Sequence, residues 1–135
     1  MSQYTFAGGI HPFDGKELSK DKPIKELLPQ GDLVYPLSQH IGAPAKPIVA
    51  VGDNVKAGQM IAEAAGFVSA NIFASVSGKV RAIEKHRVPT GGLVDSIIVD
   101  NDGKYEEIEY PPVKPLEEMS REEIIAAVKN AGVVG

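Results

Sequence analysis

The 135-residue chain contains no cysteine, and this absence removes several kinds of chemistry at once. Iron–sulfur clusters and structural zinc ions are held mainly by cysteine thiolates, so neither kind of centre is expected in this sequence. Disulfide bonds and thiol nucleophiles are excluded outright. A redox cofactor bound by these residues would therefore have to be organic, and any other would have to sit elsewhere.

Long apolar runs are also missing. No segment approaches the roughly eighteen consecutive apolar residues of a membrane-spanning helix. The N-terminus lacks the basic start and apolar stretch of a signal peptide, which predicts a cytoplasmic location. A net charge of -4 argues against nucleic acid as a partner, because phosphate binding needs clustered lysine and arginine. The hydrophobic fraction of 43% is ordinary for one soluble domain with a modest core.

Glycine and proline divide the chain into four segments. Residues 1–32 predict an irregular lead, in which Ile24–Leu28 has room for one helical turn after Pro23. Residues 33–109 contain short apolar runs between turn residues, which is typical of a β domain. Residues 110–119 predict a proline-rich linker, and residues 120–135 predict a short helix. The expected strands are Leu33–Leu37, Pro47–Val51, Met60–Ala64, Lys79–Glu84, Ser96–Asp100 and Tyr105–Glu109, with a further pair from residues 66–77.

The C-terminal segment carries signals for the start and the end of that helix. Ser120 and Glu123 predict a capping box, in which each side chain accepts from the other residue's backbone N–H. A helix this short is marginal alone in water, so it is expected to dock on this domain or on a segment that follows. The sequence ends at Val133-Val134-Gly135 with no polar tail, and it is therefore expected to be a piece of a longer chain. The apolar stripe and the C-terminal stop are Ile124, Ile125, Val128 and Gly132.

The most informative run covers residues 51–61, Val-Gly-Asp-Asn-Val-Lys-Ala-Gly-Gln-Met-Ile. Gly52 and Gly58 suit two sharp turns, and Val55 between them can reach the core. A second run at residues 72–80, Ile-Phe-Ala-Ser-Val-Ser-Gly-Lys-Val, leads through Gly78 into a strand. Together the runs resemble the biotinyl/lipoyl family, with Ser75 in place of the usual proline. The resemblance implies a mostly β barrel-sandwich hybrid fold of two packed sheets, with the irregular lead and the short C-terminal α-helix attached.

The hairpin between these two runs lacks the residue on which carrier domains depend. In the carriers that the sequence resembles, a lysine at this hairpin is acylated by biotin or lipoate. No lysine occurs here between Lys56 and Lys79, so no amide-linked cofactor is expected in any alignment register. The hairpin instead presents Phe67 and Val68. Either Phe67 is exposed and, together with Val68, forms a docking contact for another protein surface, or Phe67 folds into the core.

Longer strings resemble a more specific family over nearly the whole chain. They are Phe-Ala-Gly-Gly-Ile-His-Pro at residues 6–12, Pro-Leu-Ser-Gln-His-Ile-Gly-Ala-Pro at 36–44, Gly-Gln-Met-Ile-Ala-Glu at 58–63 and Gly-Phe-Val-Ser-Ala at 66–70. The chain resembles the N-terminal region of RnfC, a component of the Rnf complex, the membrane-bound ferredoxin:NAD oxidoreductase. The resemblance implies that a flavin- and NADH-binding domain follows, and that FMN, NAD(H) and two 4Fe-4S clusters belong to the parent chain. It transfers no catalytic, cofactor-binding or metal-binding residue to this sequence.

The same resemblance implies a role and a location. The parent subunit would take part in ion-translocating electron transfer between NAD(H) and ferredoxin, as a peripheral component on the cytoplasmic face of the cell membrane. This domain would be a non-catalytic structural or docking unit that packs on the downstream flavin/NADH domain or on other Rnf subunits. The alternative relatives are the soluble electron-transfer protein of proline reductase and the A subunit of the Na⁺-translocating quinone reductase. The string at residues 8–12 favours Rnf over both.

Histidines and a basic stretch are the remaining candidates for binding. No H-x-x-x-H spacing links His11, His40 and His86, so hydrogen-bonding roles are favoured over a metal site for the first two. His86 is expected in a solvated loop. His40 and Gly42 lie in a turn rich in glycine and proline, where a pocket for a quinone or a small anion is an alternative function. The basic stretch is explained more simply by the exposed side of a strand than by a phosphate site, and it includes Lys79 and Arg81.

Overall fold

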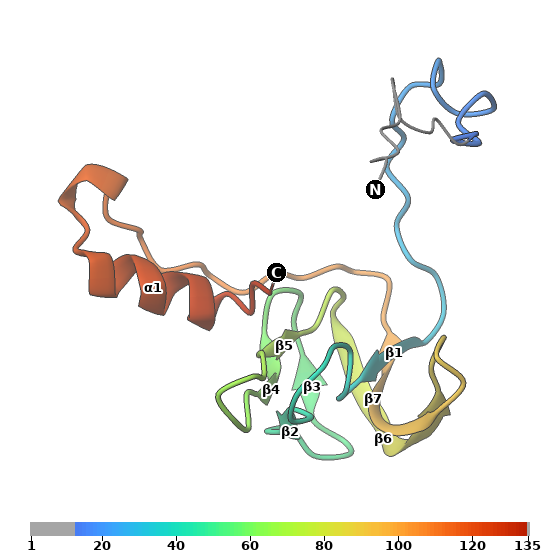
Figure 1. Ribbon diagram of the computed structural model, residues 1–135. Coiled ribbons are helices and arrows are strands. Elements are labelled where there is room, and N and C mark those ends of the chain that lie inside the picture. The colour runs from blue at the N-terminus through green and yellow to red at the C-terminus, as the bar shows by residue number, and fades with distance from the viewer. Residues whose placement is uncertain (1–12, 135) are drawn as a thin grey trace, which may run out of the picture.

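The computed structural model describes residues 13–134 and consists of two β-sheets with one α-helix attached (Figure 1). The first sheet has the strand order β1-β7-β6-β3, and the second has the order β2-β4-β5. Neighbouring strands in both sheets are antiparallel. The expectation of a mostly β fold is confirmed. The strands are β1 (Leu33–Pro36), β2 (Lys46–Pro47), β3 (Asn54–Val55), β4 (Met60–Glu63), β5 (Ile72–Phe73), β6 (Gly78–Arg87) and β7 (Leu93–Asn101).

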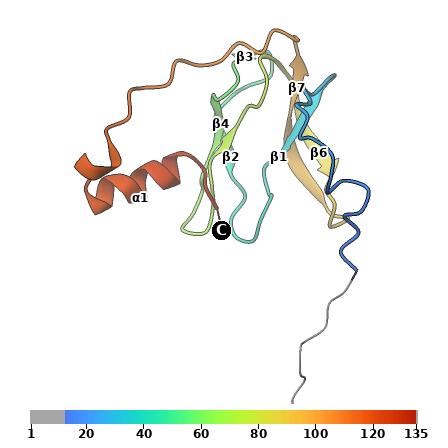
Figure 2. The same ribbon diagram turned by 90° about the horizontal axis from the view of Figure 1, so that it is seen from above.

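The hydrophobic core joins residues from both sheets, which face each other in Figure 2. Successive side chains of a strand point to opposite faces, so alternate residues can meet in the space between the sheets. Ile61 on β4, Val80 on β6 and Val99 on β7 are at most 1% exposed. Val55 is buried with them, in the place that the sequence predicted. Full burial of an aliphatic side chain contributes about 1.5–3 kcal/mol, so these contacts hold the two sheets together.

The two runs of the biotinyl/lipoyl pattern are bonded directly to one another. Gly58 N donates to Ala74 O at 2.8 Å, and Ala74 N donates to Gln59 O at 2.8 Å. Gly52 and Gly58 have φ values of 100° and 81°, in the region that favours glycine. Both sharp turns predicted around Val55 are therefore present.

Strands β6 and β7 form the longest hairpin, and they extend beyond the expected Lys79–Glu84 and Ser96–Asp100. His86 lies within β6, with Nε2 3.3 Å from Glu84 Oε1. The prediction of a solvated loop at this histidine is wrong, because the ladder with β7 continues to the residue before the turn at 88–92. The exposed position predicted for the basic stretch is confirmed at Lys79 and Arg81.

The expected strand Pro47–Val51 is shorter than predicted. Its pairing with β4 continues only as far as Ile48, whose N–H donates to Ile61 O at 3.0 Å. The chain then turns, because the Asp53 carboxylate accepts from Ala50 N at 2.8 Å. Such local hydrogen bonds from an aspartate side chain compete with the strand ladder.

Two further expectations about strands are wrong. Tyr105–Glu109 forms no strand but a single parallel bridge, between Ala57 and Glu107. Tyr105 has a φ of 55°, which interrupts an extended run. Residues 66–77 supply one short strand, β5, instead of a strand pair.

The predicted helical turn at Ile24–Leu28 is also wrong, because residues 23–30 have no regular structure. A turn forms earlier, where Lys20 N donates to Lys16 O at 2.8 Å. Ile24 and Leu27 are 103% and 90% exposed. A helix at this position would bury no apolar face against the barrel, and tertiary packing is what stabilises short helices.

Pro29 attaches the lead to the barrel. Its carbonyl oxygen accepts from Asn101 Nδ2 at 2.8 Å and from the Tyr105 hydroxyl at 2.6 Å. Both donors lie where β7 ends, beside the start of β6. Residues 13–28 extend away from this end of the barrel (Figure 1).

The linker leads away from the barrel, and the helix α1 (Arg121–Asn130) runs back toward it, so that only the C-terminal end of the helix reaches the barrel (Figure 2). A 3-10 turn, η1 (Leu116–Glu118), precedes the helix. The predicted capping box is confirmed: Ser120 Oγ accepts from Glu123 N at 3.2 Å, and Glu123 Oε2 accepts from Ser120 N at 2.8 Å. Gly132, with a φ of 68°, follows the end of the helix as predicted. Within residues 13–134, no helix is long and apolar enough to span a membrane.

Candidate functional site

The residues proposed from the sequence for a pocket and for docking come together at one end of the barrel. The loop after β1 carries His40 and Gly42, and the hairpin between β4 and β5 carries Phe67 and Val68. Ala43 N donates to Val68 O at 2.9 Å and joins the two loops. From the sequence, the pocket residues and the docking residues were separate candidates, whereas in the structure they belong to one continuous surface.

Gly42 allows this close approach of the two loops. It has a φ of 109°, and a Cβ built on it would overlap the Val68 carbonyl oxygen. Nearby, a Cβ on Gly66 would lie 3.3 Å from Ala43 Cβ. Any side chain at position 42 would both strain the backbone and push the loops apart. Gly42 therefore shapes the surface without lining its hollow.

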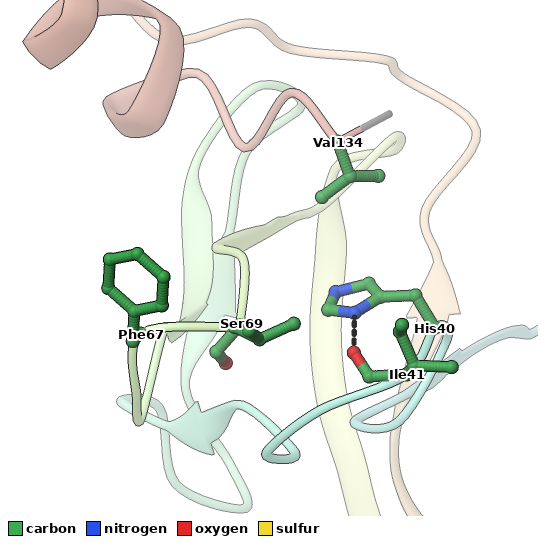
Figure 3. A pocket seen from close by; sticks show the side chains of 6 residues that line it. His40, Ile41, Phe67, Ser69 and Val134 are labelled. Carbon is green, nitrogen blue, oxygen red and sulfur yellow. Dashed lines mark hydrogen bonds between the residues drawn. The ribbon is translucent and has the colours of Figure 1, made fainter.

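The two loops and the end of the chain line an open groove of about 450 Å³ (Figure 3). Phe67 and His40 stand on either side of it, and Val134 enters from the segment after α1. In the described part of the chain, no lysine, arginine or carboxylate side chain belongs to its lining. We call this hollow the apolar groove, and its lining residues are His40, Ile41, Phe67, Val68, Ser69 and Val134.

The hairpin holds Phe67 out in solvent. The side chain is 101% exposed, which excludes the alternative that it folds into the core. The hairpin is ordered from within, because Ala65 N donates to Ser69 Oγ at 3.1 Å and Ala64 N donates to Asn71 Oδ1 at 2.9 Å. An aromatic ring displayed on a tightly bonded hairpin is a preformed contact element.

The His40 ring forms a local hydrogen bond. Nδ1 lies 2.7 Å from Ile41 O, so the neutral ring donates from Nδ1 and keeps Nε2 as an acceptor. Figure 3 shows this second nitrogen turned toward the groove. Among the described residues, no cluster of three or more metal-ligating side chains occurs. His11 lies outside the described residues.

The carboxylates whose pKa is shifted lie away from the apolar groove. The hydroxyl of buried Ser77 donates to Asp102 Oδ1 at 2.7 Å and is the main cause that lowers the pKa of Asp102. The Lys114 ammonium, 2.6 Å from Glu123 Oε1, is the main cause that lowers the pKa of Glu123. Neither carboxylate lines the groove. What the groove offers is apolar contact and one imidazole acceptor.

Asn71 fastens the C-terminal end of α1 to the hairpin. Its Nδ2 lies 3.5 Å from Lys129 O and 3.4 Å from Asn130 O. Gly132 passes so close that a Cβ on it would lie 2.6 Å from Asn71 O. These contacts bring Val134 to the groove. Asn71 and Val134 could not be found from the sequence, because contacts between segments nearly 60 residues apart leave no local pattern in it.

Comparison with known proteins identifies the family. The model of the RnfC barrel sandwich hybrid domain matches residues 4–104. The chain belongs to this family. Its barrel-sandwich fold and the resemblance to the N-terminal region of RnfC are thereby confirmed. The matched range includes the Gly-Gly-Ile-His-Pro string at residues 8–12, which lies outside the described residues.

The relatives of this RnfC domain are much longer proteins. The C subunit of the proton-translocating ferredoxin:NAD(+) oxidoreductase complex of Clostridium ljungdahlii is 45% identical over 97% of the chain, which is 29% of that protein. The C subunit of the Na(+)-translocating ferredoxin:NAD(+) oxidoreductase complex of Acetobacterium woodii is 43% identical over 97% of the chain, which is 30% of that protein. The C subunit of the ion-translocating oxidoreductase complex of Rhodobacter capsulatus is 41% identical over 100% of the chain, which is 26% of that protein. The chain thus spans less than a third of the length of these relatives.

Proposed function

We propose that this chain is a non-catalytic docking domain of the RnfC component of an ion-translocating ferredoxin:NAD oxidoreductase. The observation that carries the proposal is the fully exposed Phe67 beside Val68, on the hairpin where the carrier domains bear a modified lysine. Exposed apolar groups gathered on a rigid element favour contact with another protein surface. Membership of the RnfC family and the names of its relatives support the choice of complex.

The parent subunit, in this proposal, carries the redox chemistry in segments that follow. FMN, NAD(H) and two 4Fe-4S clusters would be bound there, at the cytoplasmic face of the membrane and in contact with other Rnf subunits. The domain at residues 33–109 would connect to them through the linker at 110–119 and the helix segment at 120–135. Because the chain has no cysteine, it has no thiolate to offer to such clusters.

The substitution Phe67→Asp in the full-length subunit tests this docking function. A charge at the contact should lower ferredoxin-dependent NAD⁺ reduction by the assembled complex about tenfold, equivalent to roughly 1.4 kcal/mol. Oxidation of NADH by the isolated subunit with an artificial electron acceptor should stay unchanged.

Val51→Asp is the matched control. Val51 is 61% exposed and precedes Gly52, whose N–H donates to Val80 O near the start of β6, at the other end of the barrel. This control should leave both activities unchanged. An equal loss of the artificial-acceptor activity in Phe67→Asp would contradict a docking role.

A small-molecule site beside His40 is the second candidate function. The groove of about 450 Å³ has the size of a ligand pocket. The described residues that line it include no lysine or arginine, which favours an apolar ligand such as a quinone over an anion. Titration calorimetry with a water-soluble quinone analogue separates the two functions. Docking predicts no heat of binding, whereas saturable heat that Phe67→Asp abolishes would favour the quinone site.

A further inference from the structure

We infer that the apolar groove binds the polypeptide that directly follows residue 135 in the full-length subunit. The partner of the docking surface is then a later part of the same chain. This inference rests on the proposed docking function and adds the identity of the partner to it.

Val134 places the end of the described chain at the groove. Val134 is the last described residue, and it lines the groove itself. The RnfC relatives have more than twice the length of this chain outside the matched region. A segment that follows so directly is tethered at the groove, with an effective concentration on the order of millimolar. A separate subunit has no such advantage in reaching the same surface.

Both sides of the groove are held in place without an occupant. The Ala43–Val68 hydrogen bond of 2.9 Å joins the two loops, and Gly42 has no room for a side chain. Asn71 holds the end of α1 at the carbonyls of residues 129 and 130, which sets the direction in which the chain leaves. A site that is already ordered loses little conformational entropy when its partner binds.

Much apolar surface on the groove and on α1 remains uncovered. Ile41 is 87% exposed and Val134 is 57% exposed, in addition to the fully exposed Phe67. The helix α1 lacks cover as well: none of its residues is buried, and Ile125 and Val128 are 44% and 46% exposed. A ten-residue helix needs tertiary contacts to persist in water. A folded segment that follows residue 135 is placed to supply them to the helix and the groove together.

The expected occupant therefore has a definite chemistry. It presents aliphatic or aromatic side chains to Ile41, Phe67 and Val68, and its charged groups stay at the rim, because the lining offers them no opposite charge. A backbone or side-chain donor placed opposite His40 Nε2 satisfies the free acceptor of the ring.

Site-specific photo-crosslinking in the intact complex tests the identity of this partner. Benzoylphenylalanine replaces Phe67 in one variant and Val51 in the control, and peptides are mapped by mass spectrometry after illumination. We expect adducts from position 67 on peptides of the same subunit beyond residue 135, and none of these from position 51. Adducts from position 67 on another Rnf subunit would overturn the inference while leaving a docking function in place. The absence of any adduct, with unchanged activity in Phe67→Asp, would contradict both the docking function and the identity of the partner.

Hydrogen exchange in the isolated full-length subunit supplies a second readout. Phe67→Asp should speed the exchange of amides 40–43 about tenfold relative to the unsubstituted subunit, and should speed exchange in the first segment after residue 135 as well. The paired response is decisive, because a purely local effect on the hairpin would not reach that segment. Val51→Asp should change neither region. Faster exchange at 40–43 alone would count against the inference.

Discussion

At position 75 a backbone N–H takes part in the packing of the barrel. Ser75 N donates to the Tyr35 hydroxyl at 3.0 Å, and Ser75 Oγ lies 3.0 Å from the same oxygen. The related carrier pattern has proline here, and proline has no N–H to donate. Tyr35 is only 9% exposed. The serine that replaces the usual proline therefore supplies an N–H for which the Tyr35 hydroxyl is the acceptor.

The substitution Ser75→Pro should lower the free energy of unfolding by about 1–3 kcal/mol, since it removes the donor from a largely buried hydroxyl. Ser75→Ala keeps the N–H and should cost less than about 1 kcal/mol. Urea denaturation of the two variants measures the difference. In a Tyr35→Phe background this difference should shrink, and a difference that persists in full would point to backbone strain instead of the hydrogen bond.

The same scale separates the residues that could be predicted from those that could not. Val55 and Gly52 were predictable, because a valine between two turn glycines is a local pattern. The sequence could nominate Phe67 but could not decide between exposure and burial. Asn71 carried no signal, because its partners are backbone carbonyls of a helix that meets it only in the folded chain.

The helix α1 depends more on its ends than on its faces. No residue of it is buried, and its first turn is closed by the reciprocal hydrogen bonds of Ser120 and Glu123. Lys114 Nζ adds a contact of 2.6 Å to Glu123 Oε1 from the linker. At its other end the helix is attached to the barrel through Asn71. Loss of the cap should therefore destabilise the helix without destabilising the barrel.

The substitution Ser120→Ala should cost about 1 kcal/mol of helix stability. Amides of α1 should exchange with solvent roughly fivefold faster, while those of β6 and β7 keep their protection, because the helix contributes no buried residue to the core. Hydrogen exchange followed by NMR or mass spectrometry gives the comparison. Ser120→Asp retains an acceptor at the cap and should behave like the unsubstituted protein.

Predictability also differs among the elements. The long strands β6 and β7 and the helix α1 were expected from local patterns, because each has many residues or strong end signals. Strand β3 was not expected, since two residues show no periodicity. The predicted strand at residues 105–109 failed because Tyr105 has a positive φ and directs its hydroxyl to Pro29. A local sequence pattern does not show that Tyr105 will bond to a residue so far away in the chain.

For the whole molecule, the boundary of the folded unit lies slightly before β1. The Pro29 carbonyl oxygen accepts two hydrogen bonds from the barrel, and Asp32 pairs with Arg81 on β6. The lead up to residue 28 has no comparable attachment among its described residues. Residues 29–32 therefore belong to the barrel energetically, although they form no strand.

A chain that begins at Pro29 should be as stable as the 135-residue protein. A chain that begins at Leu33 should lose about 1–3 kcal/mol, because Asn101 Nδ2 and the Tyr105 hydroxyl are left without their acceptor. The exposed Asp32–Arg81 pair should add less than about 1 kcal/mol to this loss. Urea denaturation of both chains measures it, and equal midpoints would place the boundary at Leu33.

The attachment of α1 through Asn71 has a mechanical consequence. The chain enters the barrel at Pro29, where β7 ends, and its last described residue, Val134, lies beside the loops at the other end of that strand. A pull between the two would load the sheets in shear along their strands, which many ladder hydrogen bonds resist together. The two weak contacts of Asn71 would yield first, peeling the helix away and releasing the linker as slack. The domain thus behaves as a stiff block on a short tether that can lengthen without unfolding the block.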